Sequence, residues 1–166
     1  MTIRERIRGV HHVAVSVPDI DIARKFYIEL LGAEEISNVA WDAGNPFIDE
    51  IVGLKDCAGK QFIARLGNTQ IEVFEYLSPR SDAQDPNRPV NLYGYTHFGL
   101  EVDDIQSVYN RMVEAGIRFH TAPDMNQITT DENGNKSGFT ATYGRDFFGN
   151  VFEILEIHEN DYIKSN

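Results

Sequence analysis

The chain is short of cations and of cysteine, and each shortage excludes a class of protein. Its 166 residues hold 15 Lys+Arg against 26 Asp+Glu, which gives a formal net charge of −11. Binding along nucleic-acid phosphates or on an anionic membrane surface requires a basic face, so we expect neither partner. The single cysteine, Cys57, cannot form an internal disulfide. This favours a reducing compartment, and we expect a cytoplasmic protein.

Long apolar runs are missing as well. No segment approaches the roughly 20 apolar residues that a membrane-spanning helix needs. Residues 1–8 carry charge with no apolar stretch after them, so we expect no secretory signal. With 42% hydrophobic and 25% charged residues, the composition is that of an ordinary globular protein.

What the chain does contain is an internal repeat. The segment HVAVSVPDI at residues 12–20 matches HFGLEVDDI at residues 97–105, at an offset of 97 − 12 = 85 residues. Both segments are typical of a strand that runs into a helix, with Asp19 and either Asp103 or Asp104 as helix N-caps.

The ends of the two halves match too, because a Gly-Asn turn followed by a strand with one glutamate recurs at residues 67–74 and 149–155. We therefore predict a first βαβββ module over residues 8–77, a linker over 78–91 and a second βαβββ module over 92–158, together forming one domain. The predicted strands lie near residues 10–17, 34–40, 60–66, 70–77, 94–102, 117–121, 137–144 and 150–157. The remaining segments, residues 45–54 and 125–136, are predicted to hold a short inserted helix and a mobile polar loop.

Strand alternation singles out four polar side chains. The valines after His12 must pack on the following helix, so His12 points to the opposite, inner face, and His97 does the same in the second half. Glu72 and Glu153 each stand between apolar strand residues, where a carboxylate is costly to bury unless it is paired or bound to a cation. Each residue alone is more often structural. Two histidines and two glutamates at equivalent places in a repeat, however, indicate one divalent metal ion, which could be Zn, Ni, Co, Mn or Fe.

The segments HHVAVSVPDIDIARKFYIELLGAEEI, TQIEVFEYLSP, THFGLEVDDI and GRDFFGNVFEILE resemble the vicinal oxygen chelate superfamily of glyoxalase I, methylmalonyl-CoA epimerase and extradiol dioxygenases. The resemblance covers residues 11–158. It implies an α+β fold in which two paired βαβββ modules form a U-shaped, partly open eight-stranded barrel around a metal. It also places His12, Glu72, His97 and Glu153 at the positions of the family's metal ligands. A homodimer is expected, since the family often dimerises and the sheet has an edge to protect.

One departure concerns the epimerase-like members, which use a further glutamate as base on the strand before the second ligand. Residues 59–65 contain no acid. The inserted segment, with Asp49 and Glu50, offers a hypothetical substitute.

Four protein ligands on a six-coordinate metal leave two neighbouring positions for adjacent substrate oxygens. A metal there would polarise a carbonyl and stabilise the enediolate that forms when the neighbouring carbon loses a proton. By resemblance to glyoxalase-like enzymes, Glu153 or Glu72 would act as the base. We therefore predict a glyoxalase-I-like lyase, isomerase or epimerase that acts on a small molecule with adjacent oxygens. Tyr76 and Arg145 are candidate substrate contacts, although a tyrosine at the core edge and a solvated arginine are commoner roles.

Two alternatives stay open. An extradiol dioxygenase would use Fe(II) held by two histidines and one carboxylate, so a fourth ligand at Glu72 discriminates against it. A non-catalytic binding protein, like the antibiotic-sequestering members, would generally lack the four metal ligands. The sequence does not decide whether the modules pair within one chain or between two.

Overall fold

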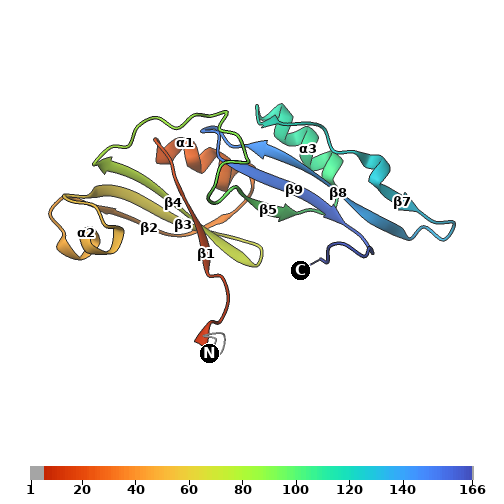
Figure 1. Ribbon diagram of the computed structural model, residues 1–166, viewed down its shortest axis with the longest axis horizontal. Coiled ribbons are helices and arrows are strands. Elements are labelled where there is room, and N and C mark those ends of the chain that lie inside the picture. Colours follow the sequence, from red (N-terminus) through yellow and green to blue (C-terminus); the bar gives the residue numbers. More distant parts are fainter. Residues whose placement is uncertain (1–5, 166) are drawn as a thin grey trace. The chain divides into compact units, whose positions relative to one another are not determined.

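The computed structural model describes residues 6–165 of a chain that divides into two compact units, residues 1–83 and 84–166 (Figure 1). Each unit contains a sheet with one helix packed on it. No helix among the described residues is long and apolar enough to cross a membrane. We expect no secretory signal in residues 1–8, and residues 1–5 of that segment lie outside the described residues.

The first unit is a four-stranded sheet in the order β1-β4-β3-β2, with β1 and β4 parallel and the other neighbours antiparallel. Its elements in chain order are β1 His12–Ser16, α1 Ile20–Arg24, η2 Lys25–Leu30, β2 Glu34–Trp41, α2 Pro46–Val52, β3 Ala58–Leu66 and β4 Thr69–Ser78. Helix α2 confirms the short helix predicted between residues 45 and 54, and Asn45 caps it.

Helix α1 continues without interruption into the π-helical turn η2, and its inner side forms the core of the first unit. The helix ends where Gly32 takes a φ of +73°, a conformation that glycine adopts without strain. The largest fully buried aromatic and aliphatic side chains of this unit lie on α1 and η2 and on the helix-facing side of β3 and β4. They include Phe26, Tyr27, Phe62, Ile71 and Val73.

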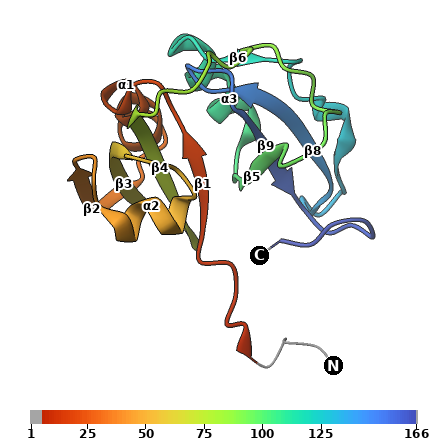
Figure 2. The ribbon, with the colours of Figure 1, turned by 60° about the vertical axis from the view of Figure 1, so that its left-hand side comes forward.

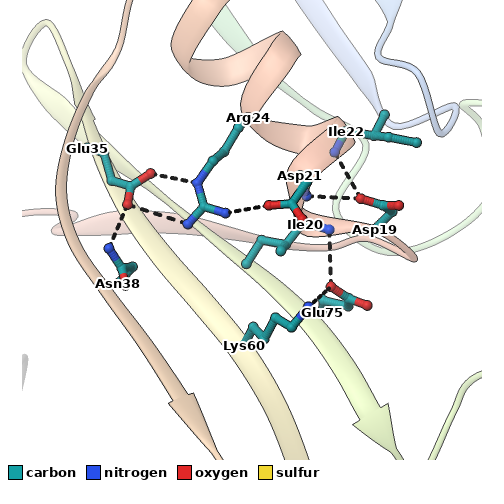
Figure 3. Close-up of polar contacts among 9 residues, drawn as sticks. All are labelled: Asp19, Ile20, Asp21, Ile22, Arg24, Glu35, Asn38, Lys60 and Glu75. Atoms are coloured by element: carbon teal, nitrogen blue, oxygen red, sulfur yellow. Dashed lines mark hydrogen bonds and ion pairs between the residues drawn. The ribbon is translucent and has the colours of Figure 1, made fainter.

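Polar contacts fix the start of α1 on the sheet (Figure 3). Asp19 caps the helix by accepting from the main-chain N–H groups of Asp21 and Ile22, both at 2.9 Å. Glu75 on β4 accepts from the N–H of Ile20 at 3.2 Å, and Lys60 Nζ lies 3.5 Å from the same carboxylate. A carboxylate is favourable at this position because the helix N-terminus carries partial positive charge.

A second ion pair fastens α1 to β2. Arg24 Nε donates to Glu35 Oε2 at 2.8 Å (Figure 3). The guanidinium also lies 5.0 Å from the ring centre of Phe62. The hydrogen bond with Glu35 raises the pKa of Arg24, and the same bond lowers the pKa of Glu35. Both groups therefore stay charged across the ordinary pH range.

The second unit repeats the plan with a sheet in the order β5-β9-β8-β6, plus β7 paired with β8. Its elements are β5 His97–Glu101, α3 Ile105–Glu114, β6 Arg118–Phe119, η3 Met125–Gln127, β7 Ile128–Thr130, β8 Lys136–Arg145 and β9 Val151–Ile157. Helix α3 packs on β9 (Figure 2). Asp104 is its N-cap, and Glu156 accepts from the N–H of Ile105 at 2.9 Å, just as Glu75 does for α1.

The predicted α+β class is confirmed, and one loop prediction is corrected. The strands of residues 6–165 form a four-stranded and a five-stranded sheet, which are not closed into a barrel. The prediction of a mobile loop over 125–136 is wrong, because η3 and β7 occupy it and β7 pairs with β8. The reason is local: Asp131 accepts from the N–H groups of Asn133 and Asn135 at 2.9 and 2.8 Å, and so closes a tight turn between the strands.

Candidate functional site

The first unit brings His12 and Glu72 into contact on one face of its sheet. Strands β1 and β4 are parallel with Ala14 opposite Glu72, so His12 lies one step away from Glu72 on that face. His12 Nε2 is 3.1 Å from Glu72 Oε2. The small side chain of Ala14 leaves room beside the glutamate. These two residues, 60 positions apart, supply one imidazole nitrogen and one carboxylate at the same point.

The other oxygen of Glu72 is held by Gln61, whose side-chain amide donates to Oε1 in a short hydrogen bond. Gln61 lies on β3, where it is opposite Phe74. The absence of an acid from residues 59–65 gave no sign of this amide, which the sequence prediction missed. With both oxygens engaged, the Glu72 carboxylate has a fixed orientation.

The second unit holds an equivalent pair. Gly99 on β5 is opposite Glu153 on β9, and His97 Nε2 is 3.4 Å from Glu153 Oε2. A Cβ added at Gly99 would lie 3.5 Å from the same oxygen, an ordinary van der Waals contact. The two pairs are therefore built by the same parallel strand pairing, with a small residue opposite each glutamate.

The ring of His97 is oriented by neighbours that the sequence did not indicate. Thr96 Oγ1 is 2.9 Å from His97 Nδ1, which leaves Nε2 for Glu153. Tyr143 is opposite Glu153 on β8, and its ring centre is 4.5 Å from that of His97. Such outer contacts commonly fix the tautomer and direction of a metal-binding histidine.

The residues of each pair fit a divalent metal. Ligands at about 2.1 Å from an ion lie about 3.0 Å apart as octahedral neighbours and about 3.4 Å apart in a tetrahedron. The observed N–O separations are 3.1 and 3.4 Å. A hydrogen bond between imidazole and carboxylate has a similar length, so each pair suits both uses. No three His, Cys, Asp or Glu side chains gather as a metal site within the described part of either unit.

A sequence model of the Glyoxalase/Bleomycin resistance protein/Dioxygenase superfamily matches residues 9–154. The chain belongs to this superfamily. Among solved structures, a glyoxalase family protein from Bacillus cereus superposes with a TM-score of 0.77 at 17% identity and covers 96% of this chain and 100% of its own. This likeness supports the fold.

Curated proteins that are similar in sequence to this chain include two kinds of epimerase. A 2-epi-5-epi-valiolone epimerase of Actinomyces sp is 30% identical over 70% of this chain and 64% of its own length. The mitochondrial methylmalonyl-CoA epimerase of Bos taurus is 31% identical over 66% of this chain and 55% of its own. The match thus spans less than two thirds of each relative. FosX of Listeria monocytogenes, solved with Mn(II) and sulfate, shares the fold at a TM-score of 0.54 and 16% identity.

The two candidate substrate contacts of this superfamily member have different surroundings. Tyr76 is half-buried on the same face as Glu72; burial raises the pKa of its hydroxyl, with smaller effects from Cys57 and Glu72. Arg145 is buried instead of solvated, and its guanidinium donates to the main-chain oxygens of Gly149 and Arg88, both at 2.9 Å. Its substrate contact stays a prediction.

The inserted helix offers less than the sequence indicated. The Asp49 carboxylate accepts from the main-chain N–H groups of Asp56 and Cys57, at 3.0 and 2.8 Å. It closes the loop between α2 and β3, a structural task that already uses both of its oxygens.

Proposed function

We propose that this superfamily member is a divalent-metal-dependent isomerase of the epimerase type, which moves a proton on the carbon beside a carbonyl group. Its substrate is a small molecule with adjacent oxygens. One observation carries the proposal: each module presents one imidazole and one carboxylate at corresponding positions of corresponding strands. In this proposal His12, Glu72, His97 and Glu153 together hold one ion.

The donor set suits such an ion. Two carboxylates neutralise a 2+ charge, and the mixture of imidazole and carboxylate suits Mn, Fe, Co, Ni or Zn. When bound, the metal would act as a Lewis acid that polarises the substrate carbonyl. Fosfomycin-resistance protein FosX, which shares the fold, was solved with Mn(II).

The surroundings of the two glutamates support different roles for them. Glu72 is held at both oxygens, by Gln61 and by His12, which suits a fixed ligand. Glu153 contacts His97 through Oε2, and Gly99, which is opposite it on β5, has no side chain. A carboxylate that is held at one oxygen keeps its other oxygen available to accept a proton. We therefore assign the proton transfer to Glu153 and the fixed ligand role to Glu72.

The curated relatives favour the epimerase class over the other members of the superfamily, since two epimerases are 30% and 31% identical to this chain over the matched residues. Proton removal and return is the step that these activities share. The extradiol dioxygenase and the binding protein remain as outcomes of the tests below.

Metal analysis of the purified chain tests the site. After refilling with Co(II) or Zn(II), we expect one ion per chain, and strong loss of binding in Glu72→Gln and Glu153→Gln. Glu75→Gln is the matched control, because Glu75 lies on the same strand as Glu72 and contacts α1 on the opposite face. Occupancy near zero after refilling, or equal loss in the control, would overturn the proposal and leave the two pairs as hydrogen bonds.

Proton transfer is measured by NMR as deuterium uptake from D₂O into methylmalonyl-CoA and into the hemithioacetal of methylglyoxal and glutathione. We expect exchange with wild type and its loss in Glu153→Gln. Oxygen consumption with catechols and Fe(II) would instead support the dioxygenase. Tight substrate-analogue binding without exchange in any metal form would support the binding protein.

We further propose that the modules pair around the ion either within a chain or between two chains of a homodimer. A mixture of His12→Ala and His97→Ala chains separates the two arrangements. If the modules pair between chains, a mixed dimer keeps one intact site and regains metal. If they pair within a chain, mixing restores nothing.

A further inference from the structure

Three aromatic side chains form a continuous group on the first sheet, next to the Glu72 pair. We call Trp41, Phe74 and Tyr76 the aromatic shelf. Phe74 and Tyr76 are stacked with ring centres 5.6 Å apart, and Trp41 lies edge-on to both at 6.3 Å. All three are half-buried.

The register puts this shelf on the same face as the metal-binding pair. Phe74 and Tyr76 follow Glu72 at intervals of two along β4, and side chains two apart share a face. Phe74 is also directly opposite Gln61, which donates to Glu72. The aromatic shelf therefore begins at Phe74, the next side chain after Glu72 on this face of β4.

Gly59 allows the indole to reach across β3. Trp41 is paired with Gly59, and Gly59 with Tyr76. A Cβ at Gly59 would lie 2.6 Å from Trp41 Cζ2, so any other residue would displace the ring. The indole N–H of Trp41 is buried with no hydrogen-bond partner among residues 6–165. Such groups are uncommon in native proteins.

The repeat supplies an internal comparison. Glu72 corresponds to Glu153 at an offset of 153 − 72 = 81 residues, and the same offset pairs Phe74 with Leu155 and Tyr76 with Ile157. The glutamate is present in both modules, whereas the aromatic rings are present in one. Aliphatic residues occupy the two corresponding strand positions in the second module, so the fold of a module does not require aromatic rings there. The aromatic shelf is therefore specific to the first module.

We propose that the aromatic shelf binds a flat ring of the substrate, whose adjacent oxygens are held at the metal. The inference rests on the proposed function, and it narrows the substrate class to ring-bearing compounds. Aromatic faces stack favourably on flat rings in offset or edge-on geometry. A ring that gains one such contact should bind about tenfold more tightly than its aliphatic counterpart.

The test uses mandelate and lactate, two 2-hydroxy acids that differ by the ring. Trp41 is the chain's one tryptophan, so fluorescence excited at the indole reports on the shelf alone. With Co(II)- or Zn(II)-loaded protein, we expect mandelate to bind about tenfold more tightly than lactate and to change the emission of Trp41. Calorimetry supplies affinities independent of the fluorescence.

Variants that copy the second module isolate the ring contact. Phe74→Leu should lower mandelate affinity toward that of lactate and leave lactate affinity unchanged, and Tyr76→Ile should also lower mandelate affinity. Phe47→Leu, at an exposed position of α2, is the matched control and should change neither. Metal content and thermal unfolding confirm that each variant is folded and loaded.

The outcomes separate the shelf from the metal proposal. Equal affinities for both acids, no binding of either, or equal loss of both in Phe74→Leu would overturn the shelf. If removing the metal leaves both affinities unchanged, the proposed metal function fails. Mandelate binding that persists without metal and still depends on Phe74 would keep the shelf and refute the metal's part in holding the ligand.

Discussion

Replacing Glu156 with glutamine should weaken the second unit, because this carboxylate is buried beneath helix α3. Its side chain is 3% exposed. It accepts hydrogen bonds from the N–H of Ile105 at 2.9 Å and from Lys136 at 3.2 Å, and it contacts His158 at 2.7 Å. Glutamine keeps the length of the side chain and can still accept from Ile105, so the substitution removes chiefly the charge.

The size of the effect follows from these contacts. A hydrogen bond to a charged group contributes about 1.5–3 kcal/mol and a neutral one about 0.5–1.5 kcal/mol, so the bond to Ile105 loses about 1–1.5 kcal/mol. Loss of negative charge at the helix N-terminus adds about 0.3–1 kcal/mol, and the half-exposed Lys136 adds less than about 1 kcal/mol. We expect a total of about 2–3 kcal/mol for Glu156→Gln.

Glu75→Gln in the first unit is the matched control. Its side chain is 13% exposed, and its contacts with Ile20 and Lys60 are longer, at 3.2 and 3.5 Å. No histidine within residues 6–165 contacts it as His158 contacts Glu156. We expect about 1 kcal/mol there. Urea unfolding at pH 7, followed by circular dichroism, measures both, with m-values that should not change. A loss in Glu156→Gln no larger than in Glu75→Gln would refute the reasoning.

The pH dependence supplies a second check. Burial raises the pKa of Glu156, but the N–H of Ile105, His158 and Lys136 outweigh it and lower the pKa overall. Because the folded pKa is below the unfolded one, this stabilisation is complete above the unfolded pKa and is lost as the pH falls through the folded pKa. The gap between wild type and Glu156→Gln should therefore shrink below about pH 4. A gap that persists unchanged to pH 3 would contradict this.

Three further substitutions have defined outcomes. Gly59→Ala should cost about 1–3 kcal/mol in urea unfolding and alter the emission of Trp41, because its Cβ would meet the indole; a double variant that also has Trp41→Ala should recover part of the loss. Asp19→Ala should cost about 1 kcal/mol in urea unfolding by removing the cap of α1, and Asp19→Asn should keep most of it. Gln61→Leu should weaken Co(II) binding by about 10–100-fold in a titration. Gln106→Leu, which removes an amide that donates to Asn110 within α3, should leave it unchanged.

The alternation and repeat of the sequence were sufficient to predict how each module begins. The βα starts at residues 12–20 and 97–105 appear in the structure as β1–α1 and β5–α3, with Asp19 and Asp104 as caps. These features depend on neighbours along the chain, which is why the sequence reveals them. The hairpin of β7 escaped prediction because polar turn residues are common both to loops and to the tight turn that Asp131 closes.

The partners of the candidate ligands could not be predicted in the same way. Gln61 reaches Glu72 only because β3 and β4 pair in one particular register, and Tyr143 reaches His97 only across β9. A shift of one residue in either register would send these side chains to the opposite face. Nothing in the local sequence around Gln61 or Tyr143 marks them.

The sequence by itself determined which residues could act: a repeated histidine and a repeated glutamate on inward-facing strand positions. Period-two alternation and internal repetition are properties of the chain, and they are legible without a structure. Only the tertiary structure decided how the two members of each pair meet. Parallel pairing of β1 with β4, and of β5 with β9, brings together residues that are 60 and 56 positions apart. The tertiary structure also decided that the Glu72 carboxylate is held at both oxygens and that the aromatic shelf lies on the same face of the sheet. Both features depend on strands that are distant in the chain.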